Sequence, residues 1–108
     1  IERHRELMME AEARFKALRV HNVVTKFGDG WQGWPEQAPF ERIIVTAAPV
    51  DIPGALVDQL ADDGVMVLPV GREKRTQSLI RVRKTDGHAK IEELDAVRFV
   101  PMVAGLPV

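Results

Sequence analysis

The spacing of apolar side chains predicts two amphipathic helices. In residues 2–19 the apolar positions recur at helical intervals, with acidic side chains in the first half and basic ones at the end, as the helix dipole favours. The apolar stripe consists of Leu7, Met8, Ala11, Phe15 and Leu18. A second helix is expected to begin at Asp51, its N-cap, with Pro53 in the first turn, and to end at residues 62–64, Asp-Asp-Gly. Its apolar face would hold Leu56, Val57 and Leu60.

Short runs of β-branched and other apolar residues predict strands between and after these helices. The expected strands are residues 23–27, 42–46, 65–71, 78–84 and 96–103, with residues 90–94 as a further candidate that pairs back across an Asp-Gly hairpin turn. The runs 42–46 and 65–71 are apolar on both faces, which is typical of parallel strands covered by helices on both sides. Residues 78–84 alternate between apolar and basic positions, with Ile80 and Val82 on the apolar face.

Composition narrows the class of protein. A chain of 108 residues, 45% hydrophobic and 29% charged, is one ordinary globular domain or less. The net charge of −1 argues against a nucleic-acid partner. The sequence has no cysteine, which is compatible with a reducing cytoplasm, and we expect a cytoplasmic location. No apolar run approaches the roughly 18 residues that cross a bilayer, so we expect no membrane association.

The charged and polar residues point to no metal site or nucleophile. Seven Lys or Arg residues lie in residues 72–90, but acidic residues interleave with them and no aromatic residue joins them. This pattern favours a solvated edge strand over a nucleic-acid surface. The three histidines, His4, His21 and His88, have no metal-ligand spacing, and no Ser-His-Asp arrangement or carboxylate pair stands out.

The stretch from Gly28 to Pro49 holds both tryptophans and the strand expected at residues 42–46. Its Gly-Asp-Gly triplet, residues 28–30, is by itself most simply a turn. Trp31 and Trp34 could form a stacking platform or an anchor that packs the loop onto the sheet. Glu2, before the first helix, could be a helix-start carboxylate or a ligand of ribose hydroxyls at the end of a strand.

The same stretch resembles the protein-L-isoaspartate O-methyltransferases. The motifs are Gly-Asp-Gly, a Trp-Pro pair, and Ala-Pro-Phe-Glu-Arg-Ile-Ile-Val-Thr-Ala-Ala-Pro at residues 38–49. The resemblance continues through Ile52-Pro53, Gln59-Leu60, Gly64, residues 68–71 and residues 97–101. It departs from the family pattern at Glu41, where Asp is frequent, and at Arg19-Val20, where a glycine often follows the helix. It covers essentially the whole chain, which looks like the C-terminal half of such an enzyme.

This resemblance implies a fold and a set of site residues. The fold would be part of a Rossmann-like α/β S-adenosylmethionine-dependent methyltransferase, with a mostly parallel sheet and antiparallel final strands, residues 1–108 forming the C-terminal part of one domain. Glu2 would hold the ribose of S-adenosylmethionine, and Asp29 and Gly30 its adenine. Substrate would be bordered by Thr46, Ala47 and Ala48 and by main-chain groups of Val100, Pro101 and Met102.

The implied reaction transfers a methyl group to the α-carboxylate of an L-isoaspartyl residue in a damaged protein. A carboxylate is already an anion, so alignment and desolvation suffice and no catalytic side chain is expected. Two other functions stay open: methylation of another acceptor, and a non-catalytic structural or interaction domain.

The glycine-rich loop that precedes the ribose ligand in such folds would lie upstream of Ile1. We therefore expect these 108 residues alone to bind cofactor weakly and not to turn over. We also expect the folded form to need the missing half, a second copy or an altered sheet, because apolar parallel edges would otherwise be exposed.

Overall fold

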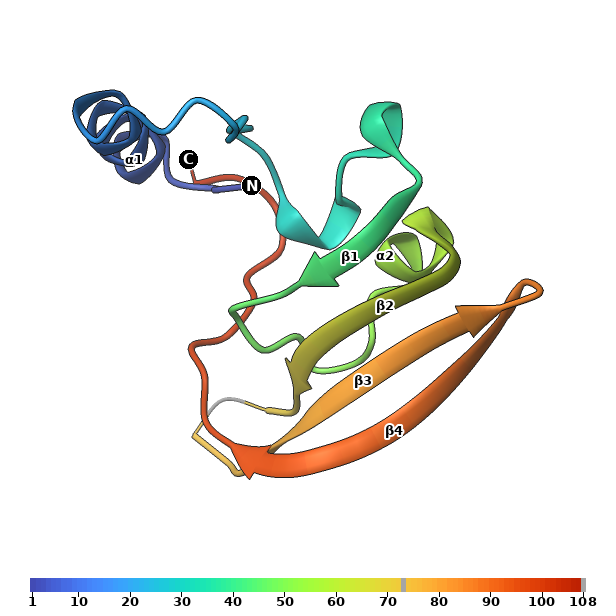
Figure 1. The fold of residues 1–108 in the computed structure, drawn as a ribbon. Coiled ribbons are helices and arrows are strands. Elements are labelled where there is room, and N and C mark those ends of the chain that lie inside the picture. The colour runs from blue at the N-terminus through green and yellow to red at the C-terminus, as the bar shows by residue number, and fades with distance from the viewer. Residues whose placement is uncertain (73, 108) are drawn as a thin grey trace. The chain divides into compact units, whose positions relative to one another are not determined.

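The computed structural model in Figure 1 describes residues 1–72 and 74–107. Its contacts divide the chain into two compact units. The first unit is Ile1–Gly30 together with the tail that begins at Ala104, and the second is Trp31–Val103. That residues 1–108 form the C-terminal part of one domain stays a prediction.

The first unit contains helix α1, Arg5–Ala17. It is shorter than the expected 2–19 at both ends. At the start, Glu2 lies outside the helix and pairs with Phe27 in a parallel β-bridge. At the end, Arg19 has a φ of 56°, outside the helical region. Four members of the apolar stripe line a groove that the helix shares with residues 23–26, namely Leu7, Met8, Ala11 and Phe15, whereas Leu18 is 73% exposed.

The strand expected at residues 23–27 is wrong except at its last residue. Only Phe27 is bridged, through bonds from the Glu2 amide to the Lys26 carbonyl (2.9 Å) and from the Gly28 amide to the Glu2 carbonyl (3.0 Å). Val24 is 78% exposed, because no neighbouring strand pairs with it in the part of the chain that the structure describes. The Arg5 guanidinium lies 4.3 Å from the centre of the Phe27 ring, a cation–π contact that holds the bridge against α1.

The second unit is built on a four-stranded mixed sheet. Its strands follow one another in chain order: β1 (Phe40–Ile44), β2 (Leu60–Val70), β3 (Gln77–Thr85) and β4 (His88–Val97). The β1–β2 pair is parallel, and the β2–β3 and β3–β4 pairs are antiparallel. Helix α2 (Gly54–Gln59) connects the parallel pair, and short 3-10 turns, η1 (Gly30–Gln32) and η2 (Pro35–Gln37), precede β1. Figure 1 shows this arrangement, with the long β3–β4 hairpin at one side of the sheet.

The core of this unit lies where α2 covers one face of the sheet. Its members are each at most 9% exposed: Leu56, Leu60, Met66, Leu68, Ile80 and Val82. The prediction that Ile80 and Val82 share the apolar face of their strand is confirmed. The Lys84 ammonium donates to the carbonyls of Val57 (3.2 Å) and Leu60 (3.0 Å), so a cation completes the C-terminal end of α2.

The strand at residues 42–46 is not buried on both faces as expected. It starts and ends earlier, at Phe40–Ile44, and Ile44 is 77% exposed. One face of β1 packs against the core through Ile43, whereas nothing among the described residues covers the opposite face, which carries Ile44. β1 is also an edge of the sheet and pairs with β2 alone among the described residues. A hydrophobic run therefore specified a strand but not what covers it.

The predicted bounds of α2 are wrong at both ends. Pro53, rather than Asp51, occupies the N-cap position, and no side-chain bond caps the helix. Residues 62–64 lie within β2, where the register moves from Phe40–Leu60 to Arg42–Val65. The positive φ of Asp63 (63°) accommodates this irregularity, so the Asp-Asp-Gly segment bends a strand instead of ending a helix.

The hairpin turn is confirmed and the last strand is not. Asp86 (φ 50°) and Gly87 (φ 77°) form a two-residue turn between β3 and β4, which the twist of the strands favours. However, β4 runs through residues 90–94 and ends at Val97. Residues 98–103 form no strand: the Gln77 side chain bonds both main-chain groups of Phe99, and only an isolated parallel bridge joins Pro101 to Ala48.

Candidate functional site

The bridge at Phe27 brings the proposed cofactor ligands to one place in the first unit. Glu2 pairs with Phe27, so it lies beside the turn that carries Asp29 and Gly30. Glu2 is itself a member of this parallel bridge and Asp29 follows Phe27 by two residues, an arrangement that fits the end of parallel strands where ligands bind in open α/β sheets. The resemblance implied these three residues together as cofactor ligands, and the fold places Glu2 close to the Asp29–Gly30 turn.

Both carboxylates are half-buried and oriented by main-chain donors. Glu2 Oε2 accepts a bond from the His4 amide (3.0 Å), and Asp29 Oδ2 accepts one from the Gly105 amide (2.9 Å). Arg3 Nε donates to the Gly105 carbonyl (3.0 Å), which holds the tail beside the Asp29 turn. A carboxylate accepts several hydrogen bonds at once, so these contacts are compatible with a ligand's hydroxyl or amino groups.

In the second unit, the two predicted substrate segments are joined at Ala48. The Ala48 amide donates to the Val100 carbonyl (2.6 Å), and the Met102 amide donates to the Ala48 carbonyl (2.9 Å). Ala48 is 2% exposed, whereas Thr46, Val100 and Pro101 are exposed. Residues 46–48 and 100–102 therefore form one continuous wall, which we call the Ala48 wall, with side chains from both segments open to solvent.

Trp31 anchors this wall. Its indole Nε1 donates to the Met102 carbonyl (2.8 Å), and the ring is half-buried. Trp34 is also half-buried, and its main-chain amide is bonded to the Gln59 side chain (2.8 Å). The indole contact favours the anchoring interpretation over a stacking platform for Trp31, whereas the Trp34 bond is made by the main chain and bears on neither interpretation.

Two buried glutamines hold the loops around the wall, and sequence analysis assigned neither a role. Gln59, 8% exposed, accepts from the Trp34 amide and donates to the Gln32 carbonyl (both 2.8 Å). Gln77, 2% exposed, accepts from the Phe99 amide (2.7 Å) and donates to the Phe99 carbonyl (3.1 Å). The only sequence signal for either role was a neutral amide side chain next to an apolar run. Such a side chain can become buried, and a buried amide needs hydrogen-bond partners for both its oxygen and its nitrogen.

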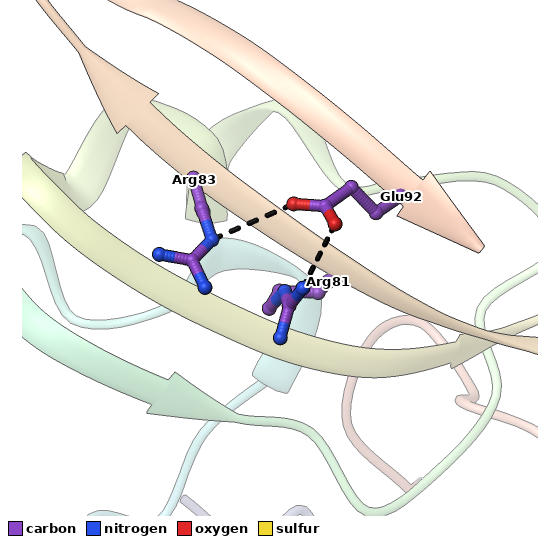
Figure 2. Close-up of polar contacts among 3 residues, drawn as sticks. All are labelled: Arg81, Arg83 and Glu92. Atoms are coloured by element: carbon purple, nitrogen blue, oxygen red, sulfur yellow. Dashed lines mark hydrogen bonds and ion pairs between the residues drawn. The ribbon is translucent and has the colours of Figure 1, made fainter. Parts of the chain in front are cut away.

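A cluster of ion pairs on the β3–β4 hairpin gives some of the basic residues at 72–90 a structural role. Figure 2 shows Arg81 and Arg83 of β3 pointing toward the two carboxylate oxygens of Glu92 on β4, at 2.8 and 3.5 Å. The hydrogen bond from Arg81, helped by the charges of Arg81, Lys90 and Arg83, lowers the pKa of Glu92 despite some desolvation. These cross-strand pairs stabilise the hairpin, consistent with the structural interpretation of the basic residues.

Among the described residues, no group of His, Asp and Glu side chains could hold a metal ion. No described helix is long and apolar enough to span a membrane.

Comparisons with known proteins identify the family. The family model for protein-L-isoaspartate(D-aspartate) O-methyltransferase (PCMT) matches residues 1–106. Two curated relatives named protein-L-isoaspartate O-methyltransferase come from Rhodospirillum rubrum and Paramagnetospirillum magneticum. They are 62% and 57% identical, and each match covers 99% of this chain and 50% of the relative. The chain thus spans about half the length of the curated relatives that it matches.

Solved structures agree. One protein-L-isoaspartate O-methyltransferase matches with a TM-score of 0.86 at 27% identity, over 96% of this chain and 33% of that one. A PCMT from Plasmodium falciparum, in complex with S-adenosyl-L-homocysteine, matches with a TM-score of 0.80 at 27% identity, over 94% and 50%. The α/β class and the antiparallel final strands expected from the sequence are confirmed, and the fold is part of a Rossmann-like fold. The chain belongs to the protein-L-isoaspartate O-methyltransferase family.

Proposed function

We propose that this chain supplies part of the cofactor site and the substrate wall of a protein-L-isoaspartate O-methyltransferase that acts in protein repair. The observation that carries the proposal is the family match over residues 1–106. The chain would act together with a part corresponding to the unmatched half of its relatives, or with a second copy. Cytoplasmic location and the lack of nucleic-acid partners stay predictions.

The first unit fits the nucleoside part of S-adenosylmethionine, which supplies an electrophilic methyl group when bound. Glu2 would accept hydrogen bonds from the ribose hydroxyls. The Asp29 carboxylate and the Gly30 amide would bind the amino group and a ring nitrogen of adenine, because one offers an acceptor and the other a donor. Support comes from the Glu2–Phe27 bridge, which places these residues beside each other.

In the second unit, the Ala48 wall would bind the peptide that carries the L-isoaspartyl residue. Thr46, Ala47 and Ala48 would border the acceptor carboxylate, and Val100, Pro101 and Met102 would line the peptide. Pro101 has no amide proton to offer to a ladder, so it suits a fixed wall. The wall would align and desolvate the carboxylate, and no residue needs to move a proton.

The test is methyl-ester formation on an isoaspartyl peptide and on its aspartyl twin. We would join residues 1–108 to the part of the Rhodospirillum rubrum relative that lies outside the match, giving a protein of family length that we call the joined protein. It should methylate the isoaspartyl peptide alone. Equal methylation of both twins would favour another acceptor, and no methylation of either would favour a non-catalytic domain. Calorimetric titration of the 108-residue chain alone should show only weak S-adenosylmethionine binding, and micromolar affinity would contradict that expectation.

Asp29→Asn in the joined protein tests the cofactor site. An amide presents one acceptor oxygen where the carboxylate presents two and a charge, so the KM for S-adenosylmethionine should rise about tenfold or more. The KM for the peptide should stay unchanged. Asp58→Asn, at an exposed position of α2, is the matched control and should change neither constant. An Asp29→Asn protein with the control's kinetics would remove Asp29 from the proposed site.

A further inference from the structure

The Gln77 side chain makes a two-bond clamp on one residue of the chain. Its amide accepts from the Phe99 N–H (2.7 Å) and donates to the Phe99 carbonyl (3.1 Å). A neighbouring strand would offer the same pair of groups, so the side chain substitutes for a strand at the point where β4 has ended. This explains how residue 99 is held without belonging to the sheet.

The clamp is itself rigid. Gln77 is 2% exposed and is the first residue of β3. A Cβ placed on Gly71 would lie 2.9 Å from the Gln77 Cγ, so the Gly71 backbone packs directly against this side chain. The Gly71 amide in turn donates to the Pro49 carbonyl (3.0 Å), next to Ala48. Burial and close packing leave the amide of Gln77 little freedom to reorient.

The clamped residue leads directly into the Ala48 wall. Val100, the next residue, accepts from the Ala48 amide (2.6 Å), and Met102 donates to the Ala48 carbonyl (2.9 Å). The Trp31 indole then holds the Met102 carbonyl (2.8 Å). Residues 99–102 are therefore fixed by contacts from β3, from the segment after β1 and from the loop before it. Of these, Gln77 is the contact at the start of the segment.

We propose that Gln77 is a positioning residue for peptide binding: by clamping the Phe99 backbone, it orients the Val100–Met102 side of the Ala48 wall. This rests on the proposed function, because it assigns the wall to the peptide. Gln77 does not touch the substrate. Its effect passes through the main chain of residues 99–100, so it should act on peptide binding and leave the cofactor site of the first unit unaffected.

Gln77→Met in the joined protein tests the proposal, because methionine is similar in length and shape but makes neither hydrogen bond. The KM for the isoaspartyl peptide should rise about tenfold, as expected for the loss of roughly 1.4 kcal/mol of binding. The KM for S-adenosylmethionine should not change, and kcat should change less than the peptide KM. Trp31→Phe, which keeps an aromatic ring but removes the donor to Met102, should give the same pattern from the other end of the segment.

Val82→Ala is the control for simple loss of stability. Val82 is fully buried on β3 and belongs to the core cluster, so this variant weakens the unit while both Gln77–Phe99 hydrogen bonds can still form. If Val82→Ala raises the peptide KM as much as Gln77→Met, the role of Gln77 is structural and the proposal is wrong. The proposal is also wrong if Gln77→Met raises both KM values equally.

Hydrogen exchange on the unsubstituted joined protein tests the clamp without any variant or activity. The Phe99 amide should be protected to the same degree as the amides of β3, although it lies outside every strand. Free exchange at Phe99 would overturn the proposal. A protected Phe99 in a protein that forms no methyl ester would instead support the clamp while contradicting the proposed function and the peptide role that rests on it.

Discussion

Gly33→Ala should be the most damaging single-methyl change in the loop that carries both tryptophans. Gly33 has a φ of 64°, and a Cβ at this position would lie 2.3 Å from the Gln59 Oε1. The Gln59 amide spans this glycine, bonding the Gln32 carbonyl on one side and the Trp34 amide on the other, both at 2.8 Å. An alanine here must displace the amide, and Gln59 is only 8% exposed, so the displaced amide has little solvent to turn to.

The loss of folding free energy in Gly33→Ala has two parts. A non-glycine residue in the left-handed region loses about 1 kcal/mol. Displacing Gln59 forfeits two hydrogen bonds of about 1 kcal/mol each and leaves buried polar groups less well satisfied. We therefore expect the free energy of unfolding to fall by about 3–4 kcal/mol.

Gly87→Ala is the matched control, because it places a non-glycine residue in the left-handed region without displacing any side chain. Gly87 has a φ of 77° and nothing lies within 4 Å of a Cβ placed there. It should lower the free energy of unfolding by about 1 kcal/mol. Urea unfolding of the joined protein, followed by far-ultraviolet circular dichroism, separates the two. With a slope of about 2 kcal/mol per molar urea, the Gly33→Ala midpoint should lie about 1 M below that of Gly87→Ala. Equal urea midpoints for the two variants would show that the Gln59 side chain does not hold this loop through its two hydrogen bonds.

Further predictions concern the core and the hairpin. Leu68→Ala, at a fully buried position, should lower the free energy of unfolding by about 2–5 kcal/mol in the same urea assay. Ile44 is 77% exposed within this chain, so Ile44→Ala should change it by less than about 0.5 kcal/mol if β1 stays uncovered in the joined protein. A large effect at Ile44 in the joined protein would show that the other part of the molecule covers β1. The lowered pKa of Glu92 means that its ion pairs add stability above the unfolded carboxyl's pKa and that this is lost as pH falls through the lower folded value. The urea midpoint of Glu92→Gln should therefore converge on that of the unsubstituted protein as pH drops below about 4. A difference that persists undiminished at low pH would contradict the assignment.

Local patterns were sufficient for the turn of the β3–β4 hairpin and for the buried face of β3. Two consecutive turn residues with positive φ, Asp86 and Gly87, follow the alternating apolar and basic positions of β3, so both features depend on neighbouring residues. The length of β4 and the register shift between Leu79 and Ile80 were not predicted. The expected strand at 96–103 failed for a non-local reason. Its apolar residues favour extended backbone, but Gln77, 22 residues away, bonds the groups of Phe99 that a neighbouring strand would need.

The candidate site, too, was predicted in part by local motifs and decided in part by contacts between distant segments. The motifs around Asp29 and Ala48 pointed to the family, and the comparisons confirm that assignment. The individual roles of Glu2, Asp29, Gly30 and the Ala48 wall stay predictions. No spacing along the chain indicated that Ala48 would bond both Val100 and Met102, because more than 50 residues separate them and loops of any conformation could intervene.

The sequence by itself determined the family, through motifs along essentially the whole chain. It also determined the presence of the first helix, the β3–β4 turn and the apolar face of β3, since each of these depends on residues within a few positions of one another. The tertiary structure decided which strand is an edge, where β4 ends, and which residues hold the Ala48 wall in place. Those features depend on hydrogen-bond partners and cover supplied by distant segments. Neither the position of Gln59 in a family motif nor the apolar run beside Gln77 indicated which groups the two amides bond, because those partners are brought near only by the folded chain.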